Sequence, residues 1–118
     1  MALKFQRGAV VYVRQVSDER GGNHKDRRVV LVADFDDADP TAFAVAITSQ
    51  FGQPLRADMV RLSFHRQGKC GSSLTKDSVA VCNWFIVVAS EDIRDKTGFV
   101  TSKQLVQILE RVESRFRE

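Results

Sequence analysis

Short runs of β-branched and aromatic residues alternate with polar, glycine-containing segments along most of the chain. Runs of this kind, bounded by turn-forming residues, are typical of β-strands. The pattern is clearest at residues 59–64, where Val60, Leu62 and Phe64 share one face and polar side chains take the other. The hydrophobic pattern predicts strands at residues 8–14, 28–33, 43–48, 59–64 and 78–89.

The segments between these strands carry the glycine, proline and charge that favour loops. Residues 15–27 include two adjacent glycines and are predicted to form a long mobile loop. Residues 34–40 form an acidic connection, residues 51–57 a second loop, and residues 65–76 a basic, glycine-containing loop.

The last part of the chain has a helical period instead. Thr101 is a predicted N-cap, with Gln104 placed as in a capping box. Apolar residues then recur at helical spacing: Leu105, Ile108, Leu109, Val112 and Phe116. This stripe predicts an amphipathic helix that runs to the chain terminus. Five strands and one late helix predict an α+β fold that is mainly β, a small antiparallel barrel or sandwich with the helix packed on it.

The third predicted strand has two unlike faces, because strand side chains alternate. One face is bulky and carries Phe43, Val45 and Ile47. The other is small and ends in a hydroxyl, with Ala42, Ala44, Ala46 and Thr48. Either the small face leaves room for a ligand, loop or partner, or large side chains of neighbouring strands cover the alanines.

Length and charge set the next limits. The chain has 118 residues, which fits a single domain over residues 1–118. Hydrophobic residues make up 43% of it and charged residues 28%, which argues against disorder. The net charge is only +3, so bulk charge does not establish a polyanionic partner. Basic residues concentrate in residues 1–33 and 61–76, and we expect one positive face if these segments meet.

Cysteine usage indicates a reduced, cytoplasmic protein. Cys70 and Cys82 form no CxxC motif and no disulfide framework, and they lack the companions of a zinc site. No signal peptide or membrane span is expected, because no apolar run has the required length. The acidic run lacks the spacing of a calcium loop and is predicted to be a solvated loop rather than a metal site: Asp34, Asp36, Asp37 and Asp39.

Arg27 and Arg28 stand directly before an apolar strand. A planar guanidinium matches phosphate oxygens, so a phosphate grip is one interpretation and a solvated strand end is the other. Alternation points Arg27 to the face opposite Arg28, where we expect a solvated or structural role.

Histidines and aromatic residues offer further candidates. His24 and His65 are the only histidines, and each is either an acid–base group or an exposed loop residue. Trp84 and Phe85 either stack on bases or belong to the core or a dimer interface.

Four stretches of the chain, in this order and spacing, resemble segments of the MazF/PemK toxins of toxin–antitoxin systems: RRVVLVADF, AVAITSQ, LTKDSVAVCNWF and SKQLVQILERV. The likeness runs from Gly8 to Val112. It implies a homodimer with an SH3-like antiparallel barrel of the CcdB/MazF type and a C-terminal helix. A cognate protein antitoxin is expected to occupy the RNA groove.

The resemblance also implies an activity. Such toxins are metal-independent endoribonucleases, so no cofactor is expected. The 2′-hydroxyl of single-stranded RNA attacks the adjacent phosphate and leaves a 2′,3′-cyclic phosphate and a 5′-hydroxyl, which inhibits translation and growth. The family's catalytic arginine and threonine fall on Arg28 and Thr48. Further residues are candidates for contact with the RNA: His24, Lys25, Ser49, Gln50, Arg66 and Lys69. For Lys25, Arg66 and Lys69 the alternative is ordinary surface charge.

The chain departs from the family pattern at several positions. Val29 replaces the usual proline, Ala9 replaces an acid, and residues 83–86 (NWFI) replace a Glu-Gln-(Ile/Val)-Arg segment. A non-catalytic nucleic-acid or protein binding module on the same barrel is therefore the alternative function. The gyrase poisons share this barrel, but the chain ends in SRFRE and lacks their Trp-Gly-Ile tail.

Overall fold

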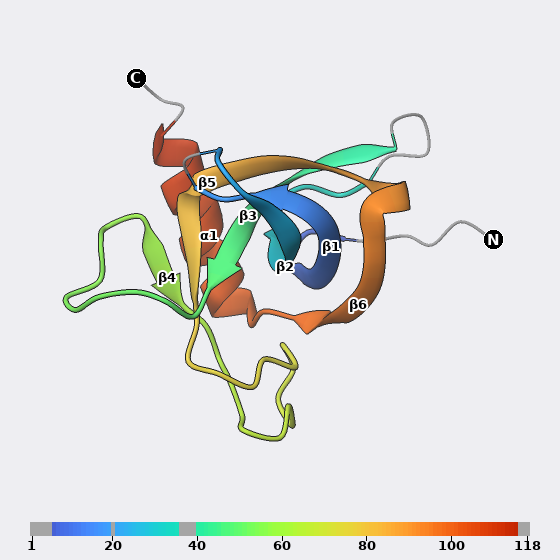
Figure 1. The fold of residues 1–118 in the computed structure, drawn as a ribbon. Helices are drawn as coiled ribbons and strands as arrows, with labels where there is room; N and C mark the ends of the chain where they lie inside the picture. Colours follow the sequence, from blue (N-terminus) through green and yellow to red (C-terminus); the bar gives the residue numbers. More distant parts are fainter. Residues whose placement is uncertain (1–5, 20, 36–39, 116–118) are drawn as a thin grey trace.

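The computed structural model describes residues 6–19, 21–35 and 40–115. One antiparallel sheet with strand order β4-β5-β3-β2-β1-β6 forms the body of the protein, and one α-helix packs beside it (Figure 1). The elements are β1 (Ala9–Ser17), β2 (His24–Leu31), β3 (Thr41–Thr48), β4 (Met59–Arg61), β5 (Val79–Ala89), a short 3₁₀ turn η1 (Ser90–Asp92), β6 (Ile93–Phe99) and α1 (Ser102–Arg115). The α+β, mainly β prediction is confirmed.

All five predicted strands are present, but β6 was not predicted. Its sequence, IRDKTGF, lacks the apolar alternation that marked the other strands. It forms because its backbone pairs along β1, from Ala9↔Phe99 to Val13↔Ile93, at the edge of the sheet. An edge strand with charged side chains is common, because only one side of its backbone is paired.

The predicted long loop over residues 15–27 is wrong. β1 continues to Ser17 and β2 begins at His24, so the two strands form a hairpin that pairs Ser17 with His24. Asp18 closes the turn, since its carboxylate accepts hydrogen bonds from the backbone N–H groups of Gly22 at 2.7 Å and Asn23 at 3.2 Å.

The sheet curls but does not close into a complete barrel, because β4 and β6 remain its two edges. The predicted strand at 59–64 is shorter, ending at Arg61, and a long segment over residues 62–78 extends away from the sheet (Figure 1). This segment returns to β6, where the Phe99 N–H donates to the Gly71 carbonyl at 2.9 Å. The SH3-like class is confirmed in an open form.

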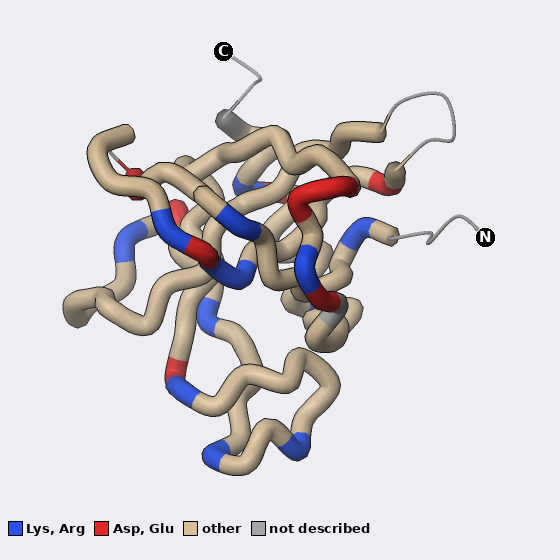
Figure 2. The backbone as a smooth tube through the Cα atoms, turned by 45° about the vertical axis from the view of Figure 1, so that its right-hand side comes forward, with Lys and Arg blue, Asp and Glu red and all other residues tan. Residues whose placement is uncertain are grey.

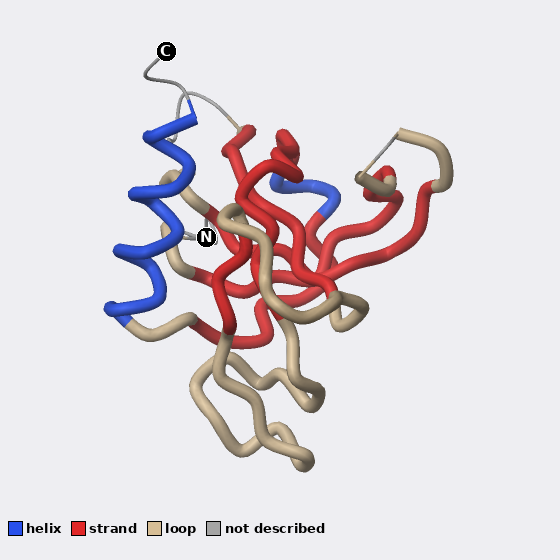
Figure 3. Tube along the Cα trace, turned by 90° about the vertical axis from the view of Figure 1, so that its left-hand side faces the viewer, coloured by secondary structure: helices blue, strands red, loops and turns tan. Residues whose placement is uncertain are grey.

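Helix α1 lies along one side of the strands (Figure 3). The predicted capping box is present: the Gln104 N–H donates to Thr101 Oγ1, and the Thr101 N–H donates to Gln104 Oε1, both at 3.1 Å. Ile108 is fully buried in a cluster with strand residues that include Val10, Val30 and Val45. Phe116, the last member of the predicted stripe, lies outside the described residues.

The small face of β3 is covered by neighbouring strands. Ala44 packs in a cluster with Val11, Val29 and Leu31, and Ala46 packs in a cluster with Trp84. The opposite face is buried at Val45 and Ile47 as predicted. Phe43 differs, because its side chain is 49% exposed.

Candidate functional site

A cavity of about 840 Å³ opens where β2 and β3 part. The two strands pair only from Val29↔Ala46 to Leu31↔Ala44, so the start of β2 and the end of β3 diverge beyond that point. Residues 25–28, 47–54 and 74–76 contribute to its wall. The basic segments 1–33 and 61–76 therefore meet here, since the lining includes Arg28 from one and Lys76 from the other.

Arg28 lies on this wall in the middle of β2 and is exposed. Its guanidinium carbon lies 5.6 Å from the ring centroid of Tyr12, its cross-strand neighbour on β1. Cation–π contact of this kind restricts a flexible side chain without neutralising its charge. The cationic head therefore stays available to an anion in the cavity.

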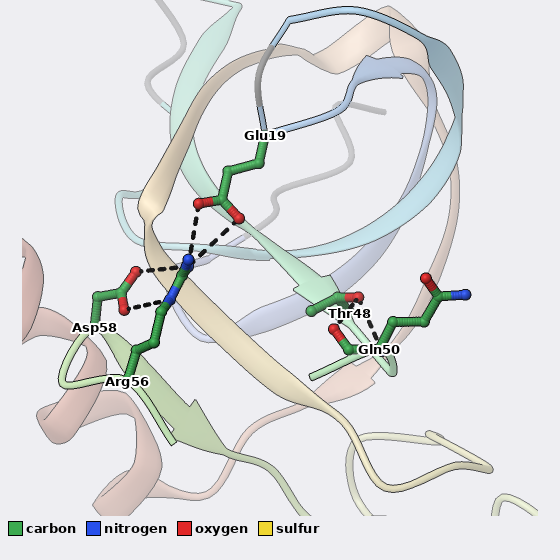
Figure 4. A network of polar contacts seen from close by, with 5 residues as sticks. All are labelled: Glu19, Thr48, Gln50, Arg56 and Asp58. Atoms are coloured by element: carbon green, nitrogen blue, oxygen red, sulfur yellow. Dashed lines mark hydrogen bonds and ion pairs between the residues drawn. The ribbon is translucent and has the colours of Figure 1, made fainter. Parts of the chain in front are cut away.

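Thr48 is the last residue of β3 and lines the same cavity. Its hydroxyl oxygen accepts a hydrogen bond from the Gln50 N–H at 3.1 Å, which fixes the side chain over the turn (Figure 4). The hydroxyl's own contact to the Gln50 carbonyl is 3.5 Å, at the limit of a hydrogen bond. A ligand oxygen can compete for that proton.

Arg27 also lines the cavity, on the face opposite Arg28 as predicted. The direct pairing of Val29 with Ala46 places Arg27 and Thr48 on one face, because side chains two apart on a strand share a face. The guanidinium carbon lies 4.6 Å from the Trp84 ring centroid. Arg27 is half-buried rather than solvated. This stack could not be predicted from the sequence, because it depends on tertiary contacts between residues far apart in the chain.

An ionic network occupies another part of the cavity wall (Figure 4). Arg56 Nη2 lies 3.1 Å from Glu19 Oε2 and 3.1 Å from Asp58 Oδ2, so one guanidinium joins the β1–β2 turn to the start of β4. The hydrogen bond that Arg56 donates to Glu19 raises the pKa of Arg56, with smaller contributions from the charges of both carboxylates. Arg56 is thus already neutralised by protein carboxylates.

The arginines of the structure fall into two groups, those that pair with a carboxylate and those that do not. Several are paired with an acid: Arg7 with Asp34, Arg14 with Asp92, Arg61 with Asp77 and Arg94 with Asp26. The backbone N–H of Arg7 also holds the pKa of Asp34 below its usual range. In contrast, Arg27 and Arg28 have no ion pair with any acid in the described part of the chain. Arg27 and Arg28 therefore line the cavity without a carboxylate partner, as do Lys25 and Lys76 among the described residues.

The other predicted RNA-contacting residues divide into two groups. Lys25, Ser49 and Gln50 line the cavity. Three do not: His24 lines a separate cavity of about 310 Å³, while Arg66 and Lys69 lie in the extended segment 62–78 (Figure 2). The cavity also contains residues that were not singled out from the sequence, such as Tyr12 and Met59, because their placement depends on how the strands pair.

The remaining candidates are also placed by the structure. His65 is exposed, and its Nδ1 accepts a hydrogen bond from the Gln67 N–H at 3.1 Å. Trp84 is 8% exposed and belongs to a buried cluster, as the core interpretation predicted. Phe85 is half-buried and lies 4.9 Å from Phe43, centroid to centroid.

No metal site is seen among the described residues, where no group of acids, histidines and cysteines is arranged to hold an ion. Of the acidic run, Asp34 is exposed, and Asp36, Asp37 and Asp39 lie outside the described residues. Both cysteines are free thiols. Within the same residues, none of the helices has the length and apolar character that a membrane crossing requires.

Comparisons with known proteins agree with this architecture. The sequence profile of the family described as "PemK-like, MazF-like toxin of type II toxin-antitoxin system" matches residues 6–116. No curated protein sequence matches the chain. Among solved structures, MazF from Deinococcus radiodurans has a TM-score of 0.74 at 15% identity, covering 99% of this chain and 100% of that one.

Two further structures show the same fold. The MazE–MazF structure from Deinococcus radiodurans (Form-II) gives a TM-score of 0.69 at 14% identity, covering 98% of each chain. The Mycobacterium tuberculosis toxin MazF-mt6 gives 0.61 at 16% identity, covering 90% of this chain and 95% of that one.

Proposed function

Because the chain belongs to the PemK-like, MazF-like toxin family of type II toxin–antitoxin systems, we propose that it is an endoribonuclease. Its substrate is single-stranded RNA, including mRNA, and its cleavage inhibits translation and growth. The observation that carries the proposal is the cavity itself, because both Arg28, which has no carboxylate partner among the described residues, and Thr48 line it.

The proposed reaction uses a nucleophile that the RNA supplies. The 2′-oxygen attacks the adjacent phosphorus, the bond to the 5′-oxygen breaks, and the proton of the 2′-hydroxyl is lost while the leaving oxygen gains one. The products are a 2′,3′-cyclic phosphate and a 5′-hydroxyl. No water or metal ion enters the proposed reaction.

Arg28 has the chemistry to stabilise the crowded, negatively charged phosphorane. Its guanidinium stays protonated, and its planar fork matches two phosphate oxygens. The Thr48 hydroxyl, whose hydrogen bond to the Gln50 carbonyl is long at 3.5 Å, donates to the same phosphate or orients the 2′-oxygen. Both groups stabilise charge that develops in the transition state. In many enzymes such electrostatic stabilisation is the largest single contribution to the rate enhancement.

Binding of the RNA is assigned to Lys25, Ser49 and Gln50 at the cavity wall. We further propose a cytoplasmic homodimer neutralised by a cognate protein antitoxin. A MazE–MazF structure among the similar folds supports the antitoxin part. An exposed apolar pair supports the dimer, because Phe43 and its cross-strand neighbour Val87 are 49% and 62% exposed.

The experiment is cleavage of a mixed-sequence, single-stranded RNA by the purified protein in excess EDTA. We expect new fragments with 2′,3′-cyclic phosphate and 5′-hydroxyl ends, identified by mass spectrometry. A matched RNA with 2′-deoxy sugars must stay intact, because it lacks the nucleophile. RNA that stays intact in EDTA while the protein still binds it contradicts the proposal and favours the non-catalytic binding module.

A further inference from the structure

The stack of Arg27 on Trp84 has no role in the function proposed above. We propose that Arg27 is a second phosphate-contacting residue for single-stranded RNA, and that Trp84 is its positioning residue. This inference rests on the proposed function for the identity of its ligand. It assigns a binding role to a residue for which the sequence indicated only a solvated or structural one.

Strand geometry is the first support. Val29 pairs directly with Ala46, so the residues two positions along each strand, Arg27 and Thr48, lie on the same face of the sheet. Arg28 lies on the other face beside Tyr12. A phosphate held near the hydroxyl of Thr48 therefore lies on the same face of the sheet as Arg27. Arg28 lines the same cavity from the opposite face.

The second support is the way the guanidinium is held. The Trp84 indole N–H donates to the Ser17 carbonyl at 3.1 Å, which fixes the ring against the β1–β2 hairpin. The same ring packs in a cluster with Ala46, whose small side chain leaves room for the indole. A guanidinium stacked on a fixed ring loses little further freedom when it binds an anion.

The third support is the missing partner. Arg27 Nε is buried and has no hydrogen-bond partner, and no acid in the described part of the chain pairs with the guanidinium. Buried donors without a partner are uncommon in folded proteins, and functional sites are one place where they occur. Since Nε is shielded from solvent, we expect the phosphate to contact the terminal nitrogens Nη1 and Nη2 of Arg27.

The experiment measures the binding of a mixed-sequence 2′-O-methyl RNA, which the proposed reaction cannot cleave. Its affinity is followed at several salt concentrations, using the fluorescence of Trp84, the only tryptophan of the chain, together with a labelled RNA. Loss of one phosphate contact lowers the slope of log affinity against log salt by about 1. We expect this loss for Arg27→Ala and for Arg27→Gln, which keeps a polar side chain.

Arg14→Ala is the control, because Arg14 is likewise a strand arginine but pairs with Asp92 and does not line the cavity. Its salt slope should equal that of the unaltered chain. Trp84→Leu should weaken binding and Trp84→Phe should restore it, with the slope kept in both. Circular dichroism establishes that each variant is folded.

The outcomes separate the two proposals. An unchanged slope and affinity in both Arg27 variants, with the unaltered chain binding RNA, overturns the role of Arg27 and leaves the cleavage proposal standing. RNA that is bound with the expected slopes but never cleaved in EDTA overturns the cleavage proposal alone. Absence of RNA binding by the unaltered chain overturns both.

Discussion

Cys82 makes the stability of the protein sensitive to alkaline pH. Cys82 is 1% exposed, on β5 beneath α1, and its thiol makes a weak, long hydrogen bond to the Ile108 carbonyl at 3.9 Å. Burial raises the pKa of Cys82 from 9.0 to about 11, with Arg111 lowering it and Asp58 raising it to smaller extents. The folded protein therefore keeps this proton where the unfolded chain loses it.

The sign of the effect follows from proton binding. Below pH 9.0 the thiol is protonated in both states and pH has no effect through it. Above that value the unfolded state ionises first, so the free energy of unfolding falls until the folded thiol ionises near pH 11. At about 1.4 kcal/mol per pH unit, the loss reaches roughly 2 kcal/mol by about pH 10.5.

Urea unfolding, followed by Trp84 fluorescence, measures this loss. Cys82→Ala is the control, because it removes this thiol and retains every other ionisable side chain. The difference in unfolding free energy between the two chains should shrink by roughly 2 kcal/mol between about pH 8.5 and pH 10.5. Parallel pH dependences in the two chains refute the reasoning, because Cys82 would then ionise as readily in the folded state.

Three other variants test the architecture and the charge of the cavity. Ile108→Ala should lower the unfolding free energy by about 2–5 kcal/mol in urea titrations, since this side chain of α1 is fully buried against the strands. A loss below ~1 kcal/mol contradicts the packing. Gly98→Ala places a Cβ 2.8 Å from the Ser72 carbonyl carbon and against the Gly71 oxygen, which must then move. Because the Phe99 N–H donates to that oxygen, hydrogen exchange at this N–H should accelerate. Unchanged exchange contradicts the close approach. Glu19→Gln removes one of two carboxylates from Arg56, so RNA should bind more tightly at low salt while the unfolding free energy changes by at most about 1 kcal/mol; weaker binding counts against the cavity as the RNA site.

The helix and most strands could be predicted because they depend on local pattern. The stripe around Ile108 and the capping box of Thr101 with Gln104 are visible in the sequence and present in the structure. β6 and the first half of β2 were missed for the opposite reason. Their sequences, IRDKTGF and HKDR, are polar, and they become strands through backbone pairing with β1.

The candidate site was predictable only in part. Family resemblance pointed to Arg28 and Thr48, and the structure brings both to one cavity. The place of Arg27 depends on the register between β2 and β3 and on Trp84, which lies far along the chain. Arg66 and Lys69 carry the right charge but do not line the cavity, although residues 74–76 of the same segment do.

The central claim is that the cavity beside Arg28 is where RNA is cut. The most direct measurement compares the rates of RNA cleavage in EDTA by Arg28→Ala and by Arg14→Ala, both confirmed as folded. Removal of a charge-stabilising donor costs ~10²–10³ in rate, so we predict that loss for Arg28→Ala and none for Arg14→Ala. Equal rates in the two variants contradict the account.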